Sequence, residues 1–353
     1  MPFERIRGVT NDPTIQLMKT REPNFNNLLK ILKNEKPDRP TIFEFAITGN
    51  YLKPNADPSV PECWDWFPSN PFLASAHKNL GYDFCCGMGS KFGFPTPKHE
   101  KGASVGLAHG GVVTDQKSLR SLDWKNPEDF DYTHLEKAIL PDGMGMIVRS
   151  PGGVLEVLTE LFGFEELCYQ IADEPELIEE TLEMIGTRMV KYFEICASIP
   201  QVGVLLHSDD WGFKSSTILS PSQLRELIIP WHKKIVEACH KQGKPVILHS
   251  CGKLDEVYED IIALGYDAKH SFEDAAVQIE SALERWGDRM PMLGGIDMDF
   301  LCRKSPEEIR ARARKLLEMT ADKGGYALGS GNSIPDYMPY ENFQAMNRVA
   351  LEW

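Results

Sequence analysis

The sequence has no apolar stretch long enough to cross a membrane. A spanning helix needs about 18 or more consecutive apolar residues, and the 353-residue chain has no such run. Its opening stretch, Met1 to Arg21, is polar and lacks the hydrophobic segment of a secretory signal. These absences predict a cytoplasmic protein that does not act at a membrane.

An excess of positive charge is also missing. The chain has 38 Lys and Arg against 52 Asp and Glu, a formal net charge of -14. A nucleic-acid partner needs a basic surface, so we expect none. The eight cysteines have no repeated spacing, which in a chain of this length argues against a disulfide framework. We expect most of them to be buried thiols.

No internal repeat and no low-complexity linker divides the chain, and no Gly-rich nucleotide loop follows the first predicted strand. The missing loop disfavours an open doubly wound sheet, which is the alternative fold. We therefore predict a single domain over 1–353, with an N-terminal helical extension at 1–38 and a barrel at 39–353.

Short apolar strands alternate with helices in the second half of the chain. Strands are predicted there at Gln201–His207, Lys244–Leu248, Asp267–Phe272, Met290–Gly294 and Tyr326–Gly329. The first half adds Thr41–Ala46, Asp83–Cys86 and Gly145–Arg149. Eight parallel strands with intervening helices are typical of a (β/α)8 TIM barrel of the α/β class.

Helix signals support this alternation. Ser220-Pro221 opens a helix that we expect to run to about Gln242, and Ser305-Pro306 opens another. The Gly- and Pro-containing segment Lys91–Asp123 fits no strand–helix unit. We expect it to form a long loop or hairpin excursion over one face.

Polar side chains gather where the predicted strands end, and catalytic residues of TIM barrels lie at those ends. From these positions we predict Asp209, Asp210 and Glu44 as catalytic residues. The predicted substrate-binding residues are Arg149, His207, His270, Glu273, Asp297, Ser330 and Asn332. The alternatives are capping of the loop before the helix for Asp209 and Asp210, a solvated loop for His270 and Glu273, and a turn for Asp297.

His249 and Cys251 are two residues apart and therefore point to the same side of an extended backbone. Imidazole and thiolate are zinc ligands, and Asp209 or Asp210 from the neighbouring strand would complete a site with one open position. The alternative is a hydrogen-bonded histidine beside an inert buried thiol. A mixed Cys, His and carboxylate set favours zinc over magnesium or calcium.

Several segments resemble the uroporphyrinogen decarboxylase superfamily. They are Asn27–Lys30 with Glu35–Pro40, Phe162–Glu165 with Asp173–Leu177, His249–Gly252, Gly294–Asp297 and the Gly-rich end of the last strand. The resemblance spans nearly the whole chain and itself implies a (β/α)8 barrel. It also implies one of two chemistries, namely decarboxylation of uroporphyrinogen III without a cofactor, or zinc-dependent methyl transfer involving a corrinoid.

The chain is more similar to the methyltransferase branch. The first strand runs Phe43-Glu44-Phe45-Ala46 and lacks the arginine-rich motif by which the decarboxylases hold substrate carboxylates. His249 and Cys251 match the His-x-Cys pair of the methyltransferases, whereas Ser330 stands where their later Cys belongs. Because serine is a poor zinc ligand, either Asp209 or Asp210 compensates or the metal is bound weakly or not at all.

This resemblance implies a methyltransferase or demethylase that exchanges a methyl group between a small methylated substrate or thiol and cobalamin on a partner corrinoid protein. We expect the protein itself to be a monomer or a homodimer. A decarboxylase acting on a porphyrinogen or smaller substrate is the alternative enzyme. A catalytically silent barrel that binds a tetrapyrrole or corrinoid is the alternative outside catalysis.

Overall fold

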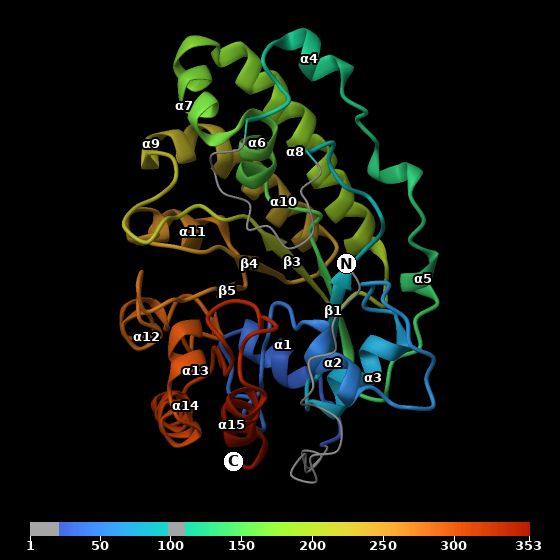
Figure 1. The fold of residues 1–353 in the computed structure, drawn as a ribbon, viewed down its shortest axis with the longest axis vertical. Helices are drawn as coiled ribbons and strands as arrows, with labels where there is room; N and C mark the ends of the chain where they lie inside the picture. The colour runs from blue at the N-terminus through green and yellow to red at the C-terminus, as the bar shows by residue number, and fades with distance from the viewer. Residues whose placement is uncertain (1–20, 98–109) are drawn as a thin grey trace.

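A sheet of seven parallel strands lies at the centre of the computed structural model, which describes residues 21–97 and 110–353 (Figure 1). The strands are β1 (Phe84–Met88), β2 (Gly145–Arg149), β3 (Val204–Ser208), β4 (Val246–His249), β5 (Ala268–His270), β6 (Met292–Leu293) and β7 (Tyr326–Ala327). They pair in chain order, and every pair is parallel. Each overlaps a predicted strand, so the α/β barrel class is confirmed.

The eighth position of the barrel is taken by residues 41–47. Ile42 forms a parallel bridge with Leu328, directly after β7. On the other side, the ring of Phe43 lies 5.4 Å from that of Phe84 in β1. The segment predicted as the first strand therefore lies between β7 and β1, but it joins β7 through isolated bridges rather than a continuous ladder.

Helices follow the strands and cover the outside of the sheet (Figure 1). The α-helices are α1 (Asn26–Leu32), α2 (Gly49–Asn55), α3 (Pro71–Asn79), α4 (Gln116–Ser121), α5 (Thr133–Glu136), α6 (Val154–Phe162), α7 (Phe164–Asp173), α8 (Pro175–Ser198), α9 (Pro221–Gln223), α10 (Ile229–Lys241), α11 (Tyr258–Leu264), α12 (Ile279–Trp286), α13 (Met298–Arg303), α14 (Pro306–Thr320) and α15 (Tyr340–Leu351). Short 3-10 turns lie at η1 (Pro127–Asp129) and η3 (Asp255–Val257). Within 21–97 and 110–353, no helix is both long and apolar enough to cross a membrane.

The helix predicted from Ser220 to about Gln242 is interrupted. Ser220 caps its start as expected, but a π-helical turn, η2 (Leu224–Ile228), separates α9 from α10. Pro230 lies in the first turn of α10 and has no backbone N–H to donate to the preceding turn. A wider turn before a proline accommodates the missing hydrogen bond.

Two predicted segments lie partly outside the described residues. Of the excursion expected at 91–123, the described parts contain no strand and one short helix, α4, while residues 98–109 are not described. Of the extension expected at 1–38, α1 is helical and residues 1–20 are not described.

Candidate metal centre and active site

The register of the strands brings His249 and His270 together inside the barrel. Ser208 at the end of β3 is paired with His249 of β4, which is paired with His270 of β5. Paired residues of neighbouring strands point to the same face of the sheet. The ring of Phe45 lies against His249, with centroids 3.9 Å apart. Both histidines therefore lie at the C-terminal end of the barrel interior, as predicted.

A metal-ligand group forms around His249. The donor atoms of Asp210, His249 and Cys251 all lie within 4.8 Å of one another. The Cys251 sulfur is 3.6 Å from His249 Nε2, and Asp210 Oδ1 is 3.9 Å from the same nitrogen. Tetrahedral zinc with bonds of about 2.3 Å to sulfur and about 2.0 Å to nitrogen separates these two atoms by about 3.5 Å. The three side chains therefore fit a zinc ion with a fourth position left open.

The hydrogen bonds of His270 determine which nitrogen of His249 is free. His270 Nε2 lies 3.2 Å from the carbonyl oxygen of Ser330, which only accepts, so Nε2 carries the hydrogen. Burial lowers the pKa of His270 to about 3, so the ring is neutral and its Nδ1 accepts. His249 Nδ1, 2.7 Å away, must then be the donor. The lone pair of His249 Nε2 consequently points toward Asp210 and Cys251, as a metal ligand requires.

Polar groups from three loops surround the Cys251 sulfur. Asn332 Nδ2 donates to it across 3.2 Å, and Ser271 Oγ lies 3.4 Å away. The backbone N–H of Cys251 donates to Asp210 Oδ1 at 2.7 Å, which fixes the carboxylate beside the thiol. Burial, and then the charge of Asp210, raises the pKa of Cys251. Burial also raises the pKa of Asp210.

The sequence analysis proposed Asp209 or Asp210 as a metal ligand, and of these two Asp210 lies beside His249 and Cys251 whereas Asp209 does not. Asp209 is fully buried and accepts the backbone N–H groups of Leu155 and Glu156 at the start of α6. It also accepts Trp211 Nε1 at 3.0 Å and is 2.8 Å from His232 Nε2. Its oxygens therefore cap α6 from a neighbouring loop and do not reach the group of Asp210, His249 and Cys251, so a role for Asp209 as ligand or base there stays a prediction.

His207 was predicted to bind substrate, but it faces away from the barrel interior. It is one residue before Ser208 on β3 and so points to the opposite face. Its ring contacts Phe193 of α8 and His232 of α10, and its Nδ1 is 2.9 Å from the hydroxyl of Tyr266. His207, Asp209 and His232 form a second, fully buried donor group beneath the helices.

Glu44 and Ser330 are paired with each other rather than with the metal donors. Phe45 faces the interior, so Glu44, the residue before it, points outward. Both oxygens of Glu44 contact Ser330, one of them through the backbone N–H at 2.8 Å. Burial raises the pKa of Glu44 to about 8. Glu44 and Ser330 therefore contact each other rather than the metal donors, and their roles in catalysis and substrate binding stay predictions.

Of the remaining residues predicted to bind substrate, Asp297 caps a helix, whereas Glu273 and Arg149 are half-buried. Asp297 caps α13 by accepting the N–H of Phe300 and also accepts that of Asp274, so it fulfils the turn role that was its alternative. Glu273 is half-buried, and burial followed by the charges of Asp297 and Asp210 raises its pKa. Arg149 ends β2, and its guanidinium lies 5.1 Å from the Phe45 ring centroid.

Sequence reasoning missed Phe45, Ser271 and Lys269. Phe45 gave no signal, because an aromatic residue in a strand is normally core. Lys269 was detectable as a lysine inside an apolar strand. It is 2% exposed and donates to the carbonyl groups of Ser250 and Ser271. It thereby ties together the loops after β4 and β5, and burial lowers its pKa to about 8.

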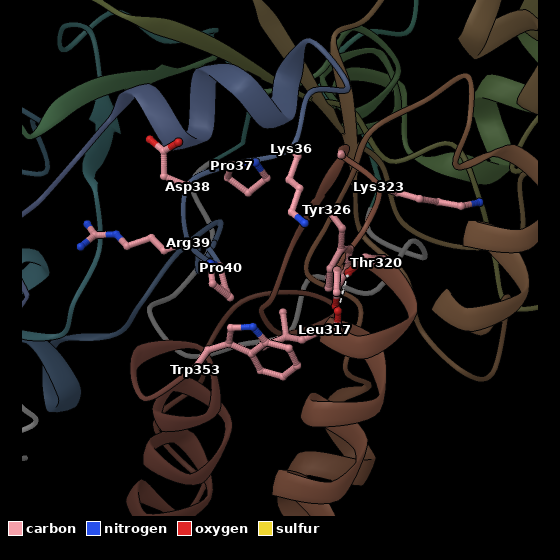
Figure 2. A pocket seen from close by; sticks show the side chains of 12 residues that line it. Lys36, Pro37, Asp38, Arg39, Pro40, Leu317, Thr320, Lys323, Tyr326 and Trp353 are labelled. Atoms are coloured by element: carbon pink, nitrogen blue, oxygen red, sulfur yellow. Dashed lines mark hydrogen bonds between the residues drawn. The ribbon is translucent and has the colours of Figure 1, made fainter.

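A separate hollow of about 230 Å³ lies at the opposite end of the barrel, beside Pro40 and Tyr326 (Figure 2). Each of its cations has an acidic partner: Lys36 with Asp322, Arg39 with Asp83 and Lys323 with Asp288. The hollow therefore offers no unpaired charge for a ligand.

The parallel α/β barrel and the donor group at its C-terminal end define a protein of the TIM-barrel class. The family model for uroporphyrinogen decarboxylase (URO-D) matches residues 134–353. The chain belongs to this family, whose members are enzymes, and the resemblance read from the sequence is confirmed.

Individual relatives are distant. The chain is 28% identical over 196 residues to a uroporphyrinogen decarboxylase of Methylococcus capsulatus (strain ATCC 33009 / NCIMB 11132 / Bath), covering 54% of this chain and 53% of that protein. It is 22% identical over 257 residues to one of Azoarcus sp. (strain BH72), covering 66% and 67%. The chain thus spans about half the length of the first of these relatives.

A solved methyltransferase from Methanosarcina mazei has a similar fold. The two structures superpose with a TM-score of 0.65 at 18% identity, over 94% of this chain and 99% of that one. At this identity the likeness supports the barrel fold alone.

Proposed function

We propose that the protein is a methyltransferase or demethylase that moves a methyl group between a small methylated substrate or thiol and cobalamin on a partner corrinoid protein. The observation that carries this proposal is the group of Asp210, His249 and Cys251, whose spacing suits zinc with one open position. The shared fold with a methyltransferase supports it.

Asp210, His249 and Cys251 would hold the zinc ion, which when bound supplies Lewis acidity toward a thiol or toward the atom that leaves the methyl group. His270 orients His249 through the bond between their Nδ1 atoms. Asn332 stabilises negative charge on the Cys251 sulfur by donating to it. Glu273 and Asn332, both half-buried beside the centre, are the side chains we assign to polar groups of the substrate.

The test is the absorbance spectrum of methylcobalamin mixed with the zinc-supplemented full chain and a panel of thiols. We expect demethylation with at least one thiol in the wild type and its loss in Cys251→Ala. Cys302→Ala is the matched control, since Cys302 is also half-buried but lies on α13. No demethylation by the wild type, or equal rates in wild type and Cys251→Ala, would contradict the proposal.

The second candidate is a decarboxylase, favoured by the names of the relatives in Methylococcus capsulatus and Azoarcus sp.. The acidic character of the barrel mouth argues against a decarboxylase, because Asp210 is one of the metal donors and the carboxylate of Glu273 lies close enough to interact with it. A silent corrinoid-binding barrel is separated from both by the absence of turnover with either substrate.

We further infer that the chain is one folding unit over 1–353, in which the described part of the extension, residues 21–38, packs on the barrel of 39–353. A single cluster of buried hydrophobic residues extends from Leu28 to Ala350, which supports this inference. Two separate unfolding transitions in calorimetry would contradict it.

A further inference from the structure

Arg149 faces the same interior as the metal donors. It is paired with Leu206 of β3, two residues before Ser208, and Ser208 is paired with His249. Residues two apart on a strand share a face, so Arg149 and His249 both point inward. Phe45 contacts both side chains, with His249 stacked on its ring and the Arg149 guanidinium 5.1 Å from its centroid.

The guanidinium of Arg149 has no polar partner within 21–97 and 110–353. Its Nε is buried and makes no hydrogen bond, and no carboxylate lies within ion-pair distance. Other partly buried arginines are paired: Arg39 with Asp83, and Arg312 with both Asp274 and Glu280. Arg149 is half-buried, and its Nε is shielded from solvent without a partner, so its guanidinium beside the metal donors is suited to an anionic ligand.

We propose that Arg149 binds the carboxylate of a small methylated substrate, an inference that rests on the proposed methyl transfer. The planar guanidinium matches a carboxylate with two parallel hydrogen bonds. The acidic side chains of Asp210 and Glu273 favour a singly charged group over a phosphate, because a dianion is repelled more strongly. The substrate class is therefore a monocarboxylate that also carries an O-, N- or S-methyl group.

This assignment gives a role to an arginine that has no acidic partner among the described residues, whereas the nearby Lys269 is already bound to the carbonyl groups of Ser250 and Ser271. The carboxylate would lie at Arg149, beside Phe45, while the methyl group faces Asp210, His249 and Cys251. A substrate with many carboxylates finds one arginine here. A small neutral substrate would leave the guanidinium unpaired and is disfavoured.

Isothermal titration of the full chain with matched probe pairs tests the proposal. The pairs are methoxyacetate with methoxyacetamide, 4-methoxybenzoate with 4-methoxybenzamide, and glycine betaine with its amide. We expect at least one carboxylate to bind the wild type about 10- to 100-fold more tightly than its amide, as charge-assisted hydrogen bonds allow. Arg149→Gln should abolish this preference, and Arg149→Lys should retain part of it.

Arg285→Gln is the matched control, because Arg285 also contacts a ring, that of Trp286, but lies on the outer surface in α12. It should bind like the wild type. No preference for any carboxylate in the wild type, or the same preference in Arg149→Gln, overturns the proposal. A methylated sulfonate or phosphonate analogue that binds as tightly as the carboxylate overturns the assignment to a carboxylate.

Zinc content measured on the same samples separates this inference from the proposed function. Arg149→Gln should contain as much zinc as the wild type. A zinc-containing wild type without carboxylate preference would refute the role of Arg149 and leave the metal centre intact. A carboxylate preference in a protein that does not bind zinc would support Arg149 and refute the metal centre.

Discussion

The ring of Phe45 lies nearly parallel to the imidazole of His249, with 18° between their planes. The stacking fixes the plane of the His249 ring, and the hydrogen bond from His249 Nδ1 to His270 Nδ1 fixes the rotation of the ring within that plane. A ligand already fixed in its binding orientation loses little conformational freedom when a metal binds. The contacts with Phe45 and His270 thus orient His249 for metal binding before a metal binds.

Replacing His270 with Phe should weaken zinc binding although His249 and Cys251 are unchanged. The variant keeps an aromatic ring against Phe43 but removes the acceptor for His249 Nδ1. We expect zinc affinity to fall about 10- to 100-fold, the range for lost partners of metal-ligating histidines. Competition with a chromophoric chelator measures this. The exposed His240→Gln is the control, and an unaltered affinity in His270→Phe would refute the orienting role.

Asp209→Asn should destabilise the whole fold. The carboxylate accepts from the start of α6, from Trp211 and from His232, and an amide would place its own donors against some of these groups. We expect a loss of about 3 kcal/mol in the free energy of unfolding, measured with urea. The exposed Asp288→Asn should remain near wild type. Equal stability of both variants would show that the Asp209 network is dispensable.

Glu44→Gln should change how stability depends on pH. The pKa of Glu44 is raised to about 8 by burial, so the native protein retains a proton that the unfolded chain loses near 4.5. This stabilisation is complete below pH 4.5 and is lost as pH rises through 8. Glutamine does not ionise. The unfolding free energy of the variant should therefore gain roughly 1 to 3 kcal/mol relative to wild type between about pH 6 and about pH 9.

A constant difference between the two proteins across that range would mean that Glu44 titrates normally.

The strands and the end of the barrel that holds the site could be predicted because both follow from local patterns. Apolar runs in the sequence predicted the strands, and the polar residues that follow these runs predicted that the site lies at the C-terminal end of the barrel. The face to which each residue points was less predictable. His207 and Glu44 were assigned to the interior, but each is one residue out of phase with an inward neighbour, Ser208 or Phe45, and short strands leave this phase poorly defined.

The choice between Asp209 and Asp210 also required the structure. The two aspartates are adjacent in a loop. The position of α6 determines that Asp209 caps this helix and that Asp210 lies beside His249 and Cys251. Gly153 precedes that helix as its N-cap and has no side chain to cap it, and a Cβ there would lie 2.0 Å from Asp209 Oδ1. This complementarity joins residues more than fifty positions apart and leaves no trace in local spacing.

The protein should not decarboxylate uroporphyrinogen III at a physiological rate. The substrate presents several carboxylates, whereas the interior face offers Arg149 as an unpaired arginine among acidic side chains, and the chain carries a net charge of -14. An anaerobic assay of coproporphyrinogen formation measures this. Turnover on the order of 1 per second, within the usual enzyme range, would show that the decarboxylase assignment is correct.

The most direct test is the zinc stoichiometry of purified full-length protein after exposure to excess zinc and removal of loosely bound metal. We expect one zinc per wild-type chain, the same in Cys302→Ala, and loss in both His249→Ala and Cys251→Ala, because these two side chains supply adjacent donors 3.6 Å apart. A wild type that retains no zinc, or a Cys251→Ala variant that retains as much as the wild type, would contradict the metal centre.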